Sequence, residues 1–226
     1  MIDYRSGSAR FVTRAEGRTT RHSFSFGSHY DPRNVGFANL VAHNDERLPP
    51  GTGYPDHPHS DLEVVTWVLS GALRHTSPVG SGVLGPGEVQ RLSAGSGVVH
   101  SEMADGQAET RFLQAWVRPD TSGLPPDYRA GEVRLGEGWT CVADAAGDGL
   151  LSLAALGTSL HAADLAAGQR LALPDAGRLH VFVSAGEVML GERRLQDGDA
   201  ARLVDEGGRE LVGEVRAQVL VWALPV

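Results

Sequence analysis

One stretch of the sequence decides how the chain folds: residues 57–71 read HPHSDLEVVTWVLSG. Its second part, Glu63–Leu69, is a run of β-branched and apolar residues that closes at Gly71, which is typical of a β-strand followed by a turn. Its first part carries His57 and His59, two residues apart. Side chains at that spacing on a strand share one face, so both imidazoles can point toward one place.

Runs of the same kind recur between turns rich in Gly, Pro and Asp, for example Phe112–Val117 and Leu179–Val183. The composition agrees, because the 226 residues include 29 Gly and 12 Pro. Short strands at regular spacing predict an all-β sandwich or barrel. A chain of this length fits one large β domain or two smaller ones.

The two halves of the chain resemble distorted copies of each other. A strand ends at Gly71 and a Gly-acid turn at Gly87 starts another, and the same order recurs at Gly186 and Gly198. A tandem of two similar β-barrels accounts for this. The expected parts are a first barrel at 1–128, a connector at 129–149 and a second barrel at 150–226.

A second pair of polar residues, His100 and Glu102, also has the spacing of one strand face. Two such strands facing each other would bring three imidazoles and a carboxylate to one point. This donor set suits iron, copper, nickel, manganese or zinc, and around an octahedral ion it leaves about two positions open. The sequence therefore predicts a mononuclear metal site in the first barrel.

The second barrel is expected to be structural. Aligned on the paired glycines, Ala172 and Pro174 fall opposite the first two histidines, while Leu211 and Gly213 fall opposite His100 and Glu102. His161 and His180 remain in this half, but each stands alone.

Composition excludes several classes of function. The chain has no lysine, so Schiff-base chemistry and a P-loop are excluded. A formal net charge of −8 argues against direct binding to nucleic acid or to an anionic membrane. A single cysteine, Cys141, excludes an internal disulfide. Neither a signal peptide nor an apolar run of membrane-spanning length is seen, so a cytoplasmic location is expected.

Two motifs resemble functional signatures but lack the structural context that those signatures need. Residues 80–85 match G-x-G-x-x-G, but Pro86 follows at once and no βαβ unit surrounds them. Ser96 and Ser101 lie near His100 without the strand-turn-helix context of a nucleophilic serine.

Several segments together resemble pirin-type bicupins. They are the histidine pair and strand at 57–71, the stretch SAGSGVVHSE at 93–102, RHSFSF at 21–26, Tyr30-Asp31-Pro32 and Gly36-Phe37. The resemblance covers about the first 120 residues strongly. It departs from the family at Ser77-Pro78-Val79-Gly80, where the family tends to have an Asp-Ser pair before Gly.

The resemblance implies two cupin barrels with metal only in the N-terminal one, held by His57, His59, His100 and Glu102. Glu102 would also act as a general base. Glu63 is the rival carboxylate, since ordinary cupins often place a ligand four residues after the second histidine. Whether Glu63 contacts the metal or only its surroundings is left open.

Further expectations concern the pocket around the metal. By alternation from the histidine pair, Val65 and Trp67 would line the cavity, with ordinary barrel packing as the alternative. By resemblance, His22 and Phe26 would close its mouth. We expect His75 to face solvent. Neither His29 nor His43 is assigned to the metal site.

Pirins are associated with quercetin 2,3-dioxygenase activity and, in eukaryotes, with iron-dependent co-regulation of transcription. The expected function is therefore a dioxygenase that cleaves a flavonol such as quercetin with O2, using one divalent metal. Iron is favoured, and copper, nickel, manganese and zinc stay open. The alternatives are a non-enzymatic regulator whose iron state tunes binding to a protein partner, and a cupin that only binds a small metabolite.

Overall fold

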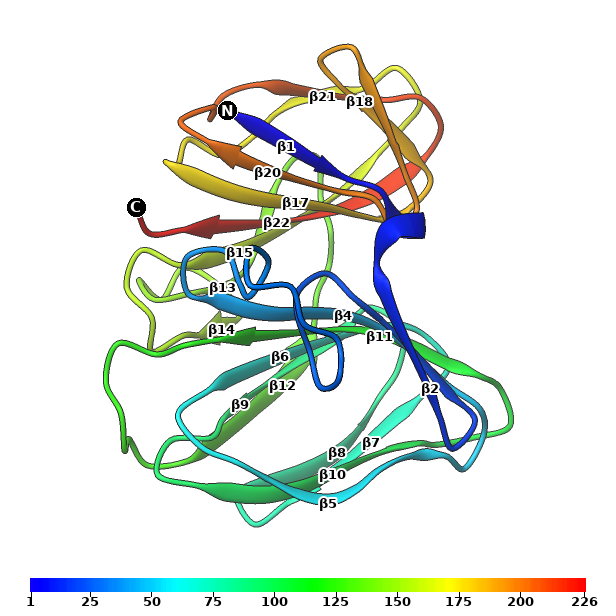
Figure 1. Cartoon of the computed structure of the whole chain (residues 1–226), viewed down its shortest axis with the longest axis vertical. Coiled ribbons are helices and arrows are strands. Elements are labelled where there is room, and N and C mark those ends of the chain that lie inside the picture. The colour runs from blue at the N-terminus through cyan, green and yellow to red at the C-terminus, as the bar shows by residue number, and fades with distance from the viewer. The chain divides into compact units, whose positions relative to one another are not determined.

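The computed structural model describes all 226 residues and contains twenty-two β-strands and one short 3-10 helix, Gly7–Ala9. The all-β prediction is confirmed. The chain forms two compact units: the first barrel comprises residues 11–133 and 153–155, and the second barrel comprises residues 1–10, 134–152 and 156–226 (Figure 1). The structure has no helix with the length and apolarity that a membrane crossing requires.

The first barrel is made of two facing antiparallel sheets. The seven-stranded sheet has the order β12-β9-β6-β11-β4-β3-β2, and the four-stranded sheet has the order β5-β10-β7-β8. The strands are β2 (Phe11–Ala15), β3 (Arg18–His22), β4 (Leu40–Leu48), β5 (Gly53–His59), β6 (Glu63–Ser70), β7 (Leu73–Ser77), β8 (Gly80–Leu84), β9 (Glu88–Ser93), β10 (Val98–Ala104), β11 (Thr110–Val117) and β12 (Asp127–Glu132).

The interior of the first barrel is layered. Alternate residues of a strand face inward, and along β6 these are Val64, Thr66 and Val68. Val64 belongs to an apolar cluster with Leu92 and Val98, and Val68 belongs to another with Phe112. Thr66 lies between them and is fully buried. A polar layer is thus enclosed between two apolar ones.

The second barrel repeats this plan. Its sheets have the orders β1-β20-β17-β22-β15-β13-β14 and β16-β21-β18-β19. The strands are β1 (Ile2–Arg5), β13 (Thr140–Asp144), β14 (Leu151–Ser152), β15 (Ser159–Leu165), β16 (Arg170–Ala172), β17 (Arg178–Ala185), β18 (Glu187–Leu190), β19 (Arg193–Gln196), β20 (Ala200–Val204), β21 (Glu210–Gly213) and β22 (Ala217–Leu224).

The paired glycines occupy equivalent places in the two barrels. Gly71 follows β6 with φ +74°, and Gly186 lies at the end of β17 with φ +77°. A Cβ on Gly71 would lie 2.6 Å from the carbonyl oxygen of Glu109, and one on Gly186 would meet the carbonyl oxygen of Arg216. Only glycine combines this backbone conformation with so close an approach.

The expected boundaries, 1–128, 129–149 and 150–226, differ from the observed division, in which residues 153–155 also belong to the first barrel. Residues 1–10 belong to the second barrel, because β1 pairs with β20 (blue beside orange in Figure 1) in the place that β12 takes beside β9 in the first barrel. The expected connector also holds β13 and most of β12.

The second barrel fills the polar layer with apolar residues. Leu211 pairs with Leu171, as His100 pairs with His57. The residue that takes the place of His57 is therefore Leu171 and not Ala172, one residue away from the expected position. Gly213 pairs with Val188, as Glu102 pairs with His75. Val188 and Leu211 are buried in the core cluster of this barrel, and Leu171 packs against it.

We expect Gly186→Ala to destabilise the protein much more than Gly191→Ala. Gly191 has φ +61° but nothing lies within 4 Å of its added Cβ. Its substitution should cost only the left-handed strain of about 1–2 kcal/mol, a fall in Tm of roughly 2–8 °C for a chain of this size. Gly186→Ala adds a clash with the backbone, so a thermal melt should show a fall in Tm several times as large. Equal shifts for the two variants would contradict this role of Gly186.

Candidate metal centre

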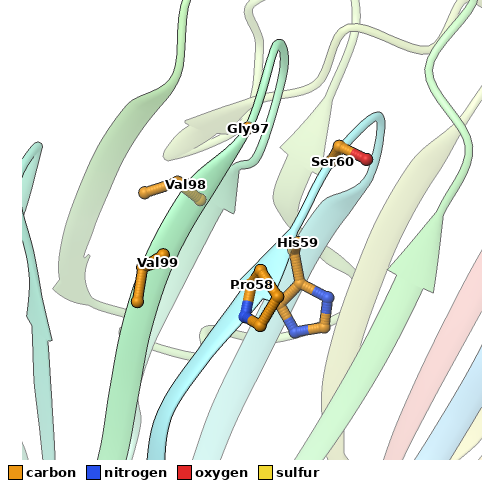
Figure 2. A pocket seen from close by; sticks show the side chains of 6 residues that line it. All are labelled: Pro58, His59, Ser60, Gly97, Val98 and Val99. Carbon is orange, nitrogen blue, oxygen red and sulfur yellow. The ribbon is translucent and has the colours of Figure 1, made fainter.

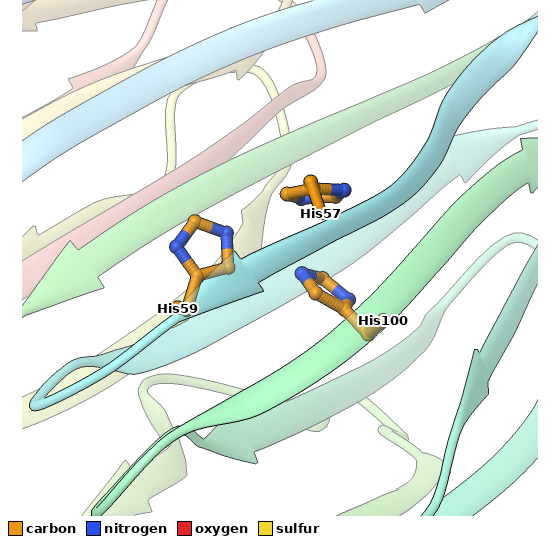
Figure 3. A group of neighbouring side chains, drawn as sticks. All are labelled: His57, His59 and His100. Carbon is orange, nitrogen blue, oxygen red and sulfur yellow. The ribbon is translucent and has the colours of Figure 1, made fainter.

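Three imidazoles converge inside the first barrel. His57 and His59 project from β5 and His100 from its neighbour β10, where His100 pairs directly with His57 (Figure 3). Their candidate ligand nitrogens all lie within 4.8 Å of one another. The ring of His100 is centred 4.3 Å from that of His57 and 5.1 Å from that of His59. We call these three residues the outer trio.

The unpaired nitrogens of this trio fit a bound cation. His100 is buried, yet neither of its ring nitrogens has a hydrogen-bond partner. Leaving buried polar atoms unpaired costs about 1–3 kcal/mol each, and a metal ion would remove that cost. His57 donates its Nδ1–H to the carbonyl oxygen of Pro55 at 2.8 Å, because a carbonyl can only accept. Its Nε2 lone pair is therefore free for a metal.

Glu102 lies on the same strand face as His100 and is completely enclosed. It forms a second group with His100 and His75, again with all ligand atoms within 4.8 Å. We call these residues the inner trio. His100 is the member that the two trios share.

Three neutral groups of the seven-stranded sheet hold the Glu102 carboxylate. Gln114 donates to Oε2 at 2.8 Å, and Gln90 and Thr66 donate to Oε1 at 2.9 and 3.4 Å. A carboxylate offers about four lone-pair sites, so one remains for a cation or a proton.

Further hydrogen bonds orient the side-chain amides of Gln114 and Gln90. The indole N–H of Trp116 is only a donor, and it donates to Oε1 of Gln114 at 3.1 Å. The hydroxyl of Tyr128 donates to Oε1 of Gln90 at 3.1 Å. The NH2 of Gln114 must therefore point at Glu102, and the Tyr128 hydrogen bond holds the NH2 of Gln90 in the same direction.

Burial sets the protonation states. It lowers the pKa of His59 and of His75 to about 4, with the neighbouring His57 adding to the effect. It lowers the pKa of His100 to about 3. These imidazoles are neutral near pH 7 and can act as ligands without losing a proton. Burial also raises the pKa of Glu102 to about 7, and a cation beside it would favour the charged form.

The expectation that His75 faces solvent is wrong. His75 is fully buried, because it shares its strand face with the buried Leu73 and pairs directly with Glu102. The ring of Tyr128 stacks on it at 4.6 Å with an interplanar angle of 11°. The alternation from Leu73 was the signal in the sequence that could have placed it.

The prediction that Val65 and Trp67 of β6 line the cavity is also wrong. A turn at residues 60–62, with Asp61 at φ +50°, separates β5 from β6, so alternation does not carry across it. Thr66 faces Glu102, which puts Val65 and Trp67 on the opposite face of the sheet, where they are packed and buried.

Glu63 shares the opposite face and belongs to neither trio. Its carboxylate accepts a hydrogen bond from Ser93 at 2.8 Å and lies 3.7 Å from the guanidinium of Arg91. Burial raises the pKa of Glu63. Its contacts are those of a buried ion pair.

A chain of rings leads from the histidines to a cavity. Trp116 contacts the ring of His59 edge-on at 4.9 Å, and Phe26 lies 5.0 Å from Trp116 and stacks on His22 at 4.8 Å. His22 and Phe26 line a cavity of about 170 Å³, together with Tyr54. His29 stacks on Phe11 at 5.2 Å, and His43 is buried on β4.

A second hollow, of about 400 Å³, lies at the end of the β5–β10 ladder (Figure 2). It is shallow and apolar, and its lining residues are Pro58, His59, Ser60, Gly97, Val98 and Val99.

A further buried carboxylate escaped the sequence interpretation. Glu46 on β4 accepts hydrogen bonds from Tyr54 at 2.8 Å and from Thr20 at 2.5 Å. Burial raises the pKa of Glu46 to about 7, with the nearby Glu102 adding to the shift. Tyr54 in turn lies 6.1 Å from the ring of His57.

Comparison with known proteins gives consistent matches. The family model for pirin matches residues 6–117. A "putative quercetin 2,3-dioxygenase" of Mycobacterium tuberculosis is 42% identical over 231 residues, covering 99% of this chain and 95% of its own. The quercetin 2,3-dioxygenase of Escherichia coli is 40% identical over 109 residues, 47% of each chain. The crystal structure of the E. coli pirin YhhW in complex with nickel(II) has a TM-score of 0.94 at 28% identity, covering 100% and 99% of the two chains.

We expect Glu46→Gln to stabilise the metal-free protein at pH 8 but not at pH 5. The folded state raises the pKa of Glu46 from about 4.5 to about 7, so it binds more protons than the unfolded state between those values. The stability that Glu46 contributes is therefore present below about pH 4.5 and is lost as the pH rises through 7. A neutral amide does not lose its proton, so Glu46→Gln should raise the free energy of unfolding at pH 8 by up to about 3 kcal/mol.

Urea unfolding at the two pH values measures the difference. The exposed Glu137→Gln is the matched control and should show no such trend. A gain for Glu46→Gln that is the same at pH 5 and pH 8 would contradict the raised pKa.

Proposed function

The chain belongs to the pirin family, as its sequence indicates, and we propose that it is a mononuclear metal-dependent dioxygenase that cleaves a flavonol such as quercetin with O2. One observation carries the proposal: three imidazoles converge beside a buried carboxylate, with the nitrogens of His100 unpaired. The relatives named quercetin 2,3-dioxygenases support the substrate class.

The proposed ligands are His57, His59, His100 and Glu102. Imidazole and carboxylate donors without a thiolate suit a divalent transition metal of borderline softness. The nickel(II) complex of YhhW supports this class of metal. We propose iron as the first metal to test, followed by nickel, copper and manganese.

A bound divalent metal would supply Lewis acidity, which favours loss of the proton from a hydroxyl placed beside it. The residues of the chain would do the rest. Pro55 holds the His57 ring, and Trp116 lies edge-on against His59. Glu102, held by Gln90 and Gln114, has one lone pair left, which would serve either the metal or, when Glu102 acts as the base, the proton of the flavonol 3-hydroxyl. Ring opening by O2 then releases carbon monoxide.

The aromatic-lined cavity is the proposed site for one ring of the substrate. A cavity of about 150 Å³ is enough to hold benzene, so about 170 Å³ accommodates a single ring and not a whole flavonol. Phe26 and Tyr54 would face that ring, and one side chain, Trp116, lies between Phe26 and His59.

Anaerobic loading with each metal, followed by quercetin and O2, tests the activity. We expect loss of the flavonol absorbance with release of one carbon monoxide per quercetin. At equal metal occupancy, Glu102→Gln should lower turnover by about 10²–10⁴-fold, because an amide accepts no proton and its NH2 would face the fixed NH2 of Gln114 or Gln90. His161→Ala in the second barrel should match the wild type.

Equal turnover in Glu102→Gln and wild type would remove Glu102 as the base. Stoichiometric metal binding without turnover by any of the four metals would contradict the dioxygenase. The two alternatives without turnover, a metal-dependent protein-binding regulator and a ligand-binding cupin, would then stand.

We expect Phe26→Ala to raise KM for quercetin about 10-fold, the equivalent of about 1.4 kcal/mol of lost ring contact, with no change in bound metal. Tyr30→Ala is the matched control, because Tyr30 follows on the same loop but is exposed. Steady-state kinetics at saturating O2 measure KM. A KM unaltered by Phe26→Ala would place the substrate elsewhere.

A further inference from the structure

We propose that the inner trio is a second cation position, in which His75 acts as a metal ligand together with His100 and Glu102. The inference rests on the proposed metal binding by the first barrel. It extends the site by one residue that the predicted ligand set does not contain.

The geometry of the inner trio permits all three residues to bind one cation. The three ligand atoms lie within 4.8 Å of one another. Two ligands at about 2.1 Å from one ion are at most about 4.2 Å apart, so the trio needs to contract by less than about 1 Å. All three residues lie on one face of the four-stranded sheet, and His75 and Glu102 are directly paired across β7 and β10.

Ring nitrogens without strong hydrogen-bond partners favour a bound cation at this position. His75 is fully buried, and its Nε2 has no hydrogen-bond partner. The other nitrogen, Nδ1, lies 3.5 Å from the NH2 of Gln90, which is longer than an ordinary hydrogen bond, so neither ring nitrogen is held by a strong partner. The stacked ring of Tyr128 fixes the plane of the imidazole. The nitrogens of His100 are unpaired as well.

Barrel packing alone does not require these polar groups. The second barrel has the same strand order, and Val188, Leu211 and Gly213 stand there in the places of His75, His100 and Glu102. Val188 and Leu211 belong to an ordinary apolar core. A cupin barrel of this chain is therefore stable without the inner trio, whereas the first barrel keeps three donors at some energetic cost.

The inner and outer positions differ in access. His57 and His59 are partly exposed, whereas every member of the inner trio is buried between the two apolar layers. Because His100 belongs to both trios, the two positions compete for one cation. A cation at the inner position would be closed to substrate and would exchange slowly with solvent.

The test removes His57 and His59, the two residues of the outer trio that the inner trio does not share. It then titrates cobalt(II), whose visible absorption reports its coordination. Wild type should bind one equivalent. His57→Ala/His59→Ala should still bind one equivalent, about 10- to 1,000-fold more weakly and with a changed spectrum. Adding His75→Phe, which keeps an aromatic ring against Tyr128, should abolish binding. Adding His161→Ala in place of His75→Phe should leave the binding of the double variant unchanged.

The outcomes separate the two proposals. No cobalt bound by the wild type would contradict the proposed function itself. Binding by the wild type, but none by a double variant that melts cooperatively, would remove the inner position and leave the proposed function intact. Equal binding with and without His75→Phe would show that His75 is not a ligand.

Discussion

The enclosed carboxylate of Glu102 imposes the strongest constraint on this structure. A charged group between two apolar layers is tolerated only when its oxygens are hydrogen-bonded or neutralised. The seven-stranded sheet meets that demand with Gln90, Gln114 and Thr66. The amides need fixed orientations, which Trp116 and Tyr128 supply. One buried charge thus determines the residues at inward positions on several strands.

The part of the site that could be predicted is the part that local geometry fixes. The pairs His57/His59 and His100/Glu102 follow from strand alternation within single strands, which needs no knowledge of the fold. The errors arise where that rule was extended across a turn, as from His59 to Val65 and Trp67. The burial of His75 follows the same rule within its own strand, since it shares a face with the buried Leu73.

Other features have no signature in the sequence. A neutral glutamine carries no motif, so Gln90 and Gln114 become visible only once their strands face Glu102. The pairing of β1 with β20, which joins Ile2 to Leu203, is equally remote in sequence. The all-β class and the repeat, in contrast, follow from patterns that recur along the chain, and the glycines after β6 and at the end of β17 mark equivalent turns.

Comparison of the two barrels separates what the scaffold needs from what the site needs. The strand orders correspond, so the apolar layers and the close-packed glycines suffice to form the barrel. The polar layer is an addition that only the first barrel carries. Trp116 connects this layer to the cavity, because its indole N–H orients Gln114 while its ring contacts both His59 and Phe26. A ligand that moves Phe26 would therefore act, through a single side chain, on one imidazole and on the amide that holds the buried carboxylate.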